Sequence, residues 1–304
     1  MKKLLLLLFI LFLIPFANAQ DIKLNGTISA ENNQIKNVAN PTDAQDAVTK
    51  NYADTQFYTQ SEVDAMIASL QSPIDGLNAG KDTGTVTDQD GNSYDYITYG
   101  TQIWTVENAE MVTYRDGTPI PQVTDNTEWQ NLTTGAWCYY GNDSSKGKLY
   151  NWYAVMGIHD AASLTDASLR KAFAPEGWHV PTDAEWTTLE NYLITNGYNY
   201  DGTTTGNKIG KAMASTTGWN TSTNTGAIGN DQSLNNDSEF NAIPEGDRNG
   251  NGSFGNEGSN AFFWSSTELN SYNAWYRTLS FNSSNHYRYT NGTHYGFSVR
   301  FVRD

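Results

Sequence analysis

Ala274-Trp-Tyr-Arg-Thr-Leu-Ser-Phe281 and Gly296-Phe-Ser-Val-Arg-Phe-Val302 are two runs near the end of this 304-residue chain in which side chains of different character alternate. A period of two is typical of β-strands that bury one face. Between them lies a segment of different composition, Asn282-Ser-Ser-Asn-His-Tyr-Arg-Tyr-Thr-Asn-Gly-Thr-His-Tyr295. The pattern therefore predicts two strands with a core face that hold a polar, tyrosine-rich segment between them.

A hairpin is expected inside this segment. Asn291-Gly292 is the strongest two-residue turn signal in the chain, since a type I′ turn requires positive φ at both positions. The turn would join a strand over residues 286–290 to a second one over residues 293–297. Alternation then puts the tyrosines of the first strand on one face and its other side chains on the opposite face, namely Tyr287 and Tyr289 against His286, Arg288 and Thr290.

The composition of this region is typical of a binding surface. From Asn270 to Tyr295 there is no Lys, Glu, Gln or Met, whereas Tyr, Ser and Asn are abundant. Tyrosine rings supply rigid contact area, and Ser and Asn supply adaptable hydrogen bonds. We therefore expect the loops and the hairpin to present a set of ligand-binding residues: Tyr272, Asn273, Tyr276, Asn285, His286, Tyr287, Arg288, Tyr289, His294 and Tyr295.

Residues 1–19 are expected to be a secretory signal peptide. Lys2-Lys3 precedes an apolar run over residues 4–14, and Ala17-Asn18-Ala19 provides the small-residue cleavage pattern. The run is shorter than the roughly 20 residues of a membrane-spanning helix. No Cys follows the cleavage site directly, so no lipid anchor is expected. The mature chain is predicted to be secreted or displayed at the cell surface, without membrane insertion.

The charge balance excludes one class of partner. The chain has 33 acidic against 18 basic residues and a formal net charge of −15 at pH 7. Such a chain repels phosphate backbones, so nucleic acid is not an expected partner. Cys138 is the only cysteine, which excludes an internal disulfide. We expect it to be a buried small hydrophobic residue rather than a nucleophile.

Residues 20–80 are expected to form a stalk. The segment has no Trp, and Ile35–Asp54 resembles a motif of bacteriophage tail fibres in which an Asn-Pro-Thr-Asp turn leads from a strand-rich shaft into a helix. After Ser61, which can cap a second helix, an apolar stripe of a/d spacing continues until Pro73: Val63, Met66/Ile67 and Leu70. Because this stripe needs a partner, we expect a coiled coil through residues 45–70, trimeric by the tail-fibre resemblance. Packing against the head of the same chain is the alternative.

Residues 81–92 are expected to be a polar linker, and residues 93–304 an aromatic-rich head. Tyr94–Val106 predicts a hairpin around Gly100-Thr101. Thr182 and Glu185 form a capping box for a helix over residues 181–193, whose inner face carries Trp186, Leu189 and Leu193. A short helix is expected over residues 208–214, with Ile209 and Met213 inward, and long loops over residues 218–258.

Six motifs follow one another through the head: Asp95–Asn108, Leu149–Ala154, Pro175–Trp186, Gly246–Arg248, Phe263–Glu268 and Gly296–Arg300. Together they resemble the Fibrobacter succinogenes major paralogous domain. The resemblance implies an exported α+β protein with a C-type-lectin-like head, in which a small twisted antiparallel sheet is accompanied by few helices and long loops. The family often has Cys at the positions that hold Ala174 and Phe301 in this chain. Both cysteines are missing together, which is what one expects if they normally pair with each other.

Two further resemblances bear on function. Formylglycine-generating enzymes share a related fold, but their oxidation chemistry needs a cysteine pair that Cys138 alone cannot supply. The composition of Asn270–Tyr295 is similar to the variable region of diversity-generating retroelement targets, where adenine substitution changes Asn codons but never yields Lys, Glu, Gln or Met. C-type-lectin-like domains are the usual hosts of such regions.

No catalytic, metal or cofactor site is expected. Asp247–Ser253 resembles the start of a calcium loop, but Gly258 stands where that loop needs a bidentate Glu. We therefore expect a binding protein, not an enzyme, that recognises a protein or glycan on a cell or phage surface. A structural or adhesive surface protein without a small ligand is the alternative. An enzyme on the formylglycine-type fold is the least favoured interpretation.

Overall fold

The computed structural model describes residues 58–78 and 82–304. The chain divides into two compact units, Met1–Ala79 and Gly80–Asp304. The predicted signal peptide, the tail-fibre-like motif and residues 45–57 of the predicted coiled coil lie outside the described residues. Among the helices that the structure does describe, none is both long and apolar enough to cross a membrane.

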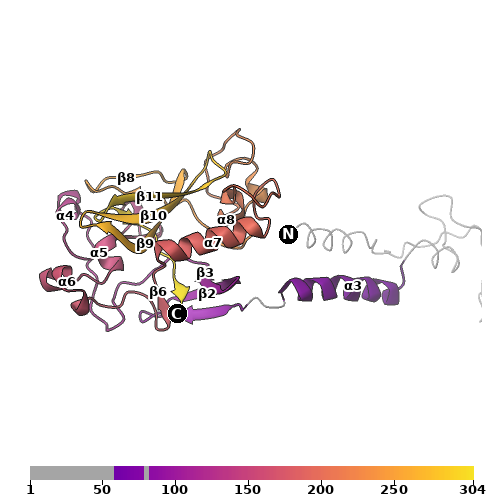
Figure 1. Cartoon of the computed structure of the whole chain (residues 1–304), viewed down its shortest axis with the longest axis horizontal. Helices are drawn as coiled ribbons and strands as arrows, with labels where there is room; N and C mark the ends of the chain where they lie inside the picture. The colour runs from indigo at the N-terminus through magenta and orange to yellow at the C-terminus, as the bar shows by residue number, and fades with distance from the viewer. Residues whose placement is uncertain (1–57, 79–81) are drawn as a thin grey trace, which may run out of the picture. The chain divides into compact units, whose positions relative to one another are not determined.

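The described part of the first unit is the helix α3, Gln60–Asn78 (Figure 1). Its cap is Thr59 rather than the predicted Ser61. The Thr59 hydroxyl accepts from the backbone N–H of Glu62 at 3.3 Å, and the Glu62 carboxylate accepts from the backbone N–H of Thr59 at 2.7 Å. These reciprocal bonds form a capping box and begin the helix earlier.

The course of α3 also corrects the predicted end of the helix. It continues through Pro73, because a proline removes one internal hydrogen bond without forbidding the turns that follow. In the expected apolar stripe, Ile67 and Leu70 are 41% and 37% exposed. Among the residues that the structure describes, part of that stripe is therefore left exposed.

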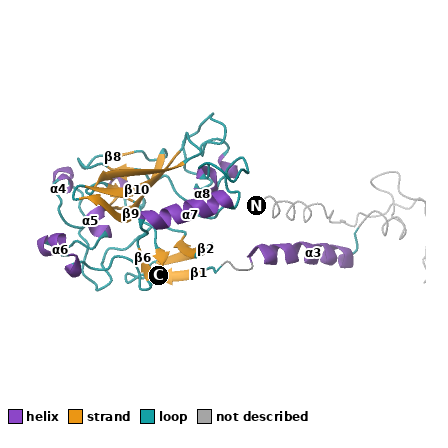
Figure 2. Cartoon of the chain, in the orientation of Figure 1, coloured by secondary structure: helices purple, strands orange, loops and turns teal. Residues whose placement is uncertain are grey.

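The head is a mixed α+β domain built on three small antiparallel sheets (Figure 2). The first has the order β1-β2-β3-β13-β6: Gly84–Thr87, Ser93–Tyr99, Gln102–Thr105, Val302–Arg303 and Trp178–His179. The second has the order β11-β10-β9: His286–Gly292, Asn273–Ser280 and Asn260–Asn270. The third has the order β4-β5-β12-β7-β8: Trp137–Tyr139, Lys148–Asn151, Gly296–Phe297, Asp247–Arg248 and Phe254–Gly255. Since β12 and β13 lie inside two different sheets, the end of the chain ties those sheets together.

The described helices of the head are short, and α7, Asp183–Thr195, is the longest of them. It begins with the predicted capping box between Thr182 and Glu185, and its predicted inner residues are fully buried: Trp186, Leu189 and Leu193. The remaining helices are α4, α5, α6 and α8, at Asn126–Gln130, Trp152–Val155, Ala161–Thr165 and Gly210–Met213. The 3₁₀ turns η1, η2 and η3 lie at Tyr140–Asn142, Ala167–Leu169 and Gln232–Leu234.

Other local predictions in the head are also confirmed. The hairpin around Gly100-Thr101 is the β2–β3 pair, in which Tyr99 lies opposite Gln102. The predicted short helix is α8, with Ile209 and Met213 buried. Residues 218–258 hold only η3, β7 and β8 and are otherwise loops, as expected.

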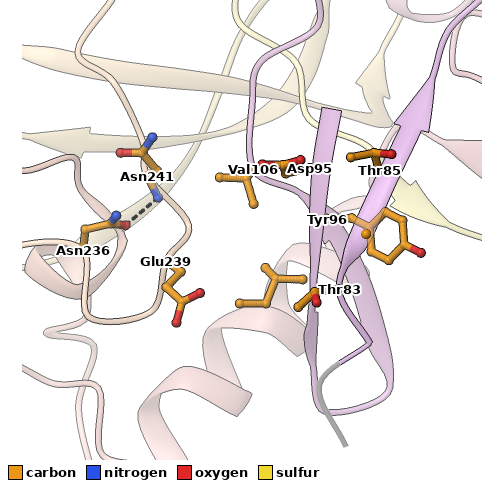
Figure 3. Close-up of a pocket in the computed structure, with 10 residues that line it drawn as sticks. Thr83, Thr85, Asp95, Tyr96, Val106, Asn236, Glu239 and Asn241 are labelled. Carbon is orange, nitrogen blue, oxygen red and sulfur yellow. Dashed lines mark hydrogen bonds between the residues drawn. The ribbon is translucent and has the colours of Figure 1, made fainter. Parts of the chain in front are cut away.

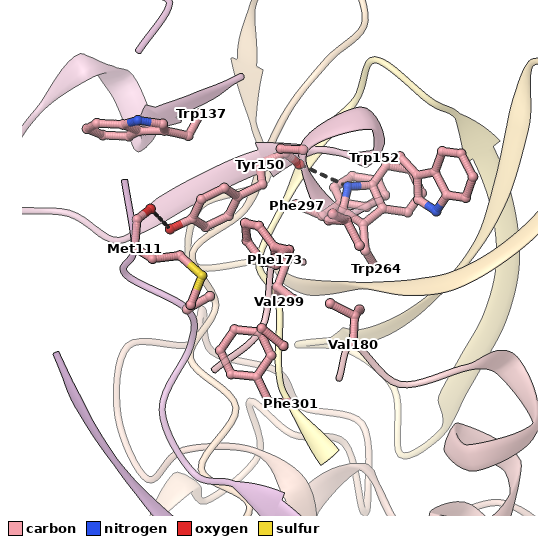
Figure 4. Packing of buried hydrophobic residues seen from close by; sticks show 14 of the residues in the cluster. Met111, Trp137, Tyr150, Trp152, Phe173, Val180, Trp264, Phe297, Val299 and Phe301 are labelled. Carbon is pink, nitrogen blue, oxygen red and sulfur yellow. Dashed lines mark hydrogen bonds between the residues drawn. The ribbon is translucent and has the colours of Figure 1, made fainter. Parts of the chain in front are cut away.

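Two large clusters of buried side chains fill the head. In the first (Figure 4), the ring of Trp264 lies 4.4 Å from that of Phe297, and its indole N–H donates to the carbonyl of Tyr150 at 2.9 Å. Buried indole groups need such partners, so this bond fixes the ring. In the second, the rings of Trp104 and Trp186 lie 4.7 Å apart and join α7 to the first sheet.

The two positions where the resemblance implies cysteine, Ala174 and Phe301, hold buried apolar residues in this chain. Ala174 and Phe301 are buried in the same cluster, and the ring of Phe173 lies 6.0 Å from that of Phe301. Apolar side chains of the core thus occupy both positions. Cys138 is also fully buried, as predicted.

The predicted Asn291-Gly292 hairpin is wrong. Both residues lie within β11, opposite Ala274 and Asn273 of β10, and neither has a positive φ. The turn between β10 and β11 is instead residues 281–285. Residues 293–297 leave this sheet, because β12 pairs with β5 and β7 in the third sheet. Tertiary pairing has overridden a local turn signal.

Candidate functional site

The three-stranded sheet places tyrosine rings on one of its faces. The register sets Tyr276 opposite Tyr289 and Thr278 opposite Tyr287, so these side chains share a face. The rings of Tyr287 and Tyr289 are stacked at 5.7 Å with an interplanar angle of 19°. The hydroxyl of Tyr287 also lies 2.8 Å from that of Ser283. The prediction that Tyr287 and Tyr289 share a face is confirmed, and we call Tyr276, Tyr287 and Tyr289 the tyrosine face.

The opposite face carries two arginines directly across from each other. Arg277 and Arg288 would repel, but Asp183 at the start of α7 accepts from both, at 2.6 Å from Nη1 of Arg277 and 2.7 Å from Nη2 of Arg288. The guanidinium of Arg288 also lies 3.4 Å from the centre of the Trp275 ring. Arg288 is therefore held in one position although its side chain is 44% exposed.

A second carboxylate completes this ion network. Glu190 of α7 accepts from Nε of Arg277 at 2.6 Å. Burial by itself would raise the pKa of both Asp183 and Glu190. Hydrogen bonds from Arg288 and Arg277 instead hold the pKa of Asp183 below its usual value. Contacts with His286 and Arg277 do the same for the pKa of Glu190. Both carboxylates are therefore charged at neutral pH.

Two predicted binding residues are buried and are corrected here. His286 is 3% exposed and faces α7, where its Nδ1 lies 3.1 Å from Oε1 of Glu190 without good hydrogen-bond geometry. Tyr276 is 9% exposed, with its ring 4.9 Å from that of Phe297. Alternation gave the correct faces, but both faces of this sheet are partly covered, so alternation did not identify the exposed residues.

The other predicted residues remain accessible in part. Tyr272 and Tyr289 are 77% and 50% exposed, and Arg288 is exposed as well. The remaining five are half-buried: Asn273, Asn285, Tyr287, His294 and Tyr295. The backbone N–H of Thr293 donates to the carbonyl of Tyr272 at 3.0 Å, which brings the β9–β10 turn to the end of β11. Asn285 precedes β11 at the other end, so the surface follows the length of this strand.

β11 is an edge strand with open backbone groups. The side chain of Asn207 bonds both backbone groups of His286, donating to its carbonyl at 2.8 Å and accepting from its N–H at 3.0 Å. Because outward and inward groups alternate along an antiparallel strand, those of Arg288 and Thr290 share this outer edge. They have no hydrogen-bond partner in the part of the chain that the structure describes. Asn207 therefore closes one end of an edge that stays open at its centre.

Sequence reasoning missed the fully buried arginines Arg248, Arg277 and Arg300. Arg300 donates to Asn108 Oδ1 at 2.6 Å and to several backbone carbonyls, and burial lowers its pKa to about 10. Arg248 lies 4.3 Å from the centre of the Trp129 ring and donates to the carbonyl of Val123 at 2.5 Å. Arg248 and Arg300 connect loops to the core, and Arg277 connects β10 to α7. The sequence signal for Arg277 and Arg300 was arginine at alternating positions within otherwise apolar runs, whereas Arg248 lies in a polar Gly-Asn segment that gave no such signal.

Two cavities lie away from the predicted residues. The larger, about 530 Å³, lies between the β1–β2 hairpin and residues 236–241, beside Asp95 and Glu239 (Figure 3). Its loop holds three non-glycine residues at positive φ: Asn236, Glu239 and Asn241. The smaller, about 270 Å³, is bordered by Tyr140 and Glu245. None of the ten predicted ligand-binding residues lines either cavity.

The described residues contain no cluster of His, Cys, Asp and Glu suited to a metal ion. Burial raises the pKa of Cys138 to about 11, so its thiol is protonated at neutral pH.

The family model described as Fibrobacter succinogenes major domain matches residues 97–303, which is more than half of the chain. Neither the curated proteins nor the solved structures that were compared gave a match.

Proposed function

The chain belongs to the Fibrobacter succinogenes major domain family, and we propose on that basis that its head is a ligand-binding module of an exported protein. The binding surface is the edge strand β11, with Tyr287 and Tyr289 on one face, Arg288 on the opposite face, and Tyr272 beside the end of the strand. The head is C-type-lectin-like in this proposal, and its ligand is a protein on a cell or phage surface. The predicted signal peptide supports export.

The observation that carries the proposal is the stacked Tyr287–Tyr289 pair on the same strand as the clamped Arg288. Stacking fixes two rings, and Asp183 fixes the guanidinium, so little side-chain entropy remains to be lost when a ligand binds. Tyr and Arg are also the side chains that most often dominate binding energy at interfaces. A surface that served only to keep the head soluble would not need this ordering.

The open edge of β11 favours a protein over a glycan. Unpaired N–H and C=O groups at a sheet edge can pair with an extended polypeptide, which adds as a further strand. Side chains of that strand would then lie against Tyr287 and Tyr289 on one face. A glycan could stack on the tyrosine rings, but it would not supply the regular series of hydrogen bonds that these backbone groups can make.

We propose two further properties of the whole protein. The exposed Ile67 and Leu70 of α3 support oligomerisation through residues 45–70 as a trimeric coiled coil. The composition of Asn270–Tyr295 supports diversification by a retroelement. A downstream repeat that differs from the gene only at adenines, beside a reverse transcriptase gene, would establish the diversification; its absence would remove this part of the proposal.

The test of binding is a selection of extended peptides from a displayed random library, run in parallel with a glycan array. We expect peptide ligands whose affinity falls at least about tenfold in Tyr289→Ala and in Arg288→Ala. Tyr58→Ala, which removes an exposed ring outside the head, is the matched control. The proposal fails if only glycans bind, or if the selected peptides bind both head variants as well as the wild type.

A further inference from the structure

The smaller cavity contains a carboxylate whose hydrogen bonding is incomplete. Oε2 of Glu245 accepts from Asn108 at 2.8 Å and from Ser298 at 2.9 Å. Its other oxygen, Oε1, has no hydrogen-bond partner among the residues that the structure describes. The carboxylate therefore has one satisfied oxygen and one available oxygen at a cavity of about 270 Å³.

The surroundings of Glu245 are rigid. Oδ1 of Asn108 accepts from Arg300 at 2.6 Å, so the amide that holds Glu245 is itself fixed from the core. Gly147 forms part of the cavity wall, and a Cβ at this position would lie 2.0 Å from Oε1 of Glu245. Gly246, next in the chain, has a φ of 70°. The backbone around the carboxylate is thus shaped to admit it and leaves little freedom for it to turn elsewhere.

The charges of the cavity favour a cation. Glu245 and Glu257 are its two carboxylates, and Lys146 is its one ammonium group. Lys146 is paired with Glu257, which leaves Glu245 without a contacting cation. Its partners Asn108 and Ser298 are neutral donors. Burial raises the pKa of Glu245, as expected when the charged form lacks full compensation.

We propose that this cavity binds a primary ammonium group on an aliphatic chain, as in a lysine side chain, with Oε1 of Glu245 as its acceptor. The apolar residues Ile243 and Pro244 line the same cavity and would contact the methylene groups. The ammonium would supply the charge and the donor that Glu245 lacks. This site is separate from the tyrosine face and is independent of the function proposed for it.

The test is isothermal titration of the full chain with N-acetyl-lysine methylamide and, for comparison, N-acetyl-norleucine methylamide. We expect saturable binding of the lysine compound only. Glu245→Gln should weaken it at least about tenfold, since a charged hydrogen bond is lost. Glu239→Gln, which neutralises a carboxylate at the larger cavity, is the matched control and should leave the affinity unchanged.

A measurement on the unmodified protein keeps the proposal testable if Glu245→Gln fails to fold. The pKa of Glu245, followed by carboxyl carbon NMR, should fall when the lysine compound is added, because a bound cation favours the charged carboxylate. Affinity should rise with pH through that pKa while the amine stays protonated. The proposal is overturned if the pKa does not move, if the norleucine compound binds equally well, or if Glu245→Gln binds as the wild type does.

Discussion

Arg277 and Arg288 provide a matched pair for measuring what burial does to the same interaction. They lie opposite each other on β10 and β11, and both bond Asp183. The side chain of Arg277 is completely buried, whereas that of Arg288 is 44% exposed. We compare Arg277→Met with Arg288→Met, since methionine keeps an unbranched apolar chain and removes only the charged end.

The structure predicts very different losses of stability. Arg277→Met leaves the enclosed Glu190 without its 2.6 Å cationic partner and removes one partner of Asp183, and breaking a buried ion pair from one side costs about 3–5 kcal/mol. Arg288→Met removes an exposed ion pair and a stacked cation, while Arg277 still compensates Asp183. Solvent screens that pair, so we expect a loss of about 1 kcal/mol.

The assay is urea unfolding of both variants and the wild type, with the slope against denaturant required to stay constant. The expected result is a large drop in the midpoint for Arg277→Met and a small one for Arg288→Met. Equal losses would refute the reasoning, because they would mean that burial does not control the strength of these bonds. A loss below about 1 kcal/mol for Arg277→Met would show that the network is dispensable.

Three further predictions concern pH, backbone geometry and the thiol. Because the pKa values of Asp183 and Glu190 are lowered in the folded state, their contribution to stability is complete above roughly pH 5 and is lost as the pH falls through those values. Urea unfolding at a series of pH values should therefore show the free energy of unfolding falling in acid. Arg277→Met should make this fall smaller. Gly292→Ala should lower the melting temperature little, since the φ of Gly292 is not positive and an added Cβ would meet nothing closer than 3.5 Å. Gly246→Ala should lower it strongly, because Gly246 has a φ of 70° and a carbonyl would lie 2.3 Å from the added Cβ. A larger loss for Gly292→Ala than for Gly246→Ala would instead favour the predicted turn at Asn291-Gly292. Cys138 should resist iodoacetamide at pH 8 until urea unfolds the head, and rapid alkylation of the folded chain would contradict its burial.

The parts of the fold that were predictable are those fixed by neighbouring residues. The capping box of Thr182 and Glu185 acts across three residues, and the β2–β3 turn at Gly100 is equally local. The Asn291-Gly292 signal is also local, but the register of β10 with β11 and of β12 with β5 involves many more bonds than one turn. Those pairings could not be read from the segment itself.

The same limit applies to the candidate surface. Alternation correctly separated Tyr287 from His286, but it could not show that α7 covers the His286 side. The residue of α7 that contacts His286 is Glu190, which lies 96 positions earlier in the chain. The carboxylates that bond Arg277 belong to the same helix. A charged residue in an alternating run therefore predicts an exposed face from the sequence alone. Only the structure shows that a carboxylate far away in the sequence pairs with it and allows it to be buried.

The ion network explains how an edge strand can be both open and rigid. α7 holds β10 and β11 from one side through Asp183 and Glu190, so the other side of the strand need not be packed to be ordered. In the described part of the chain, the hydroxyls of Tyr272 and Tyr289 bond no other residue, so replacing them would break no side-chain hydrogen bond of the scaffold. Replacing His286, in contrast, would alter the core beside α7. The fold thus places an exposed residue, Tyr289, and a buried one, His286, within a single strand, an arrangement that the proposed diversification of a binding surface would require.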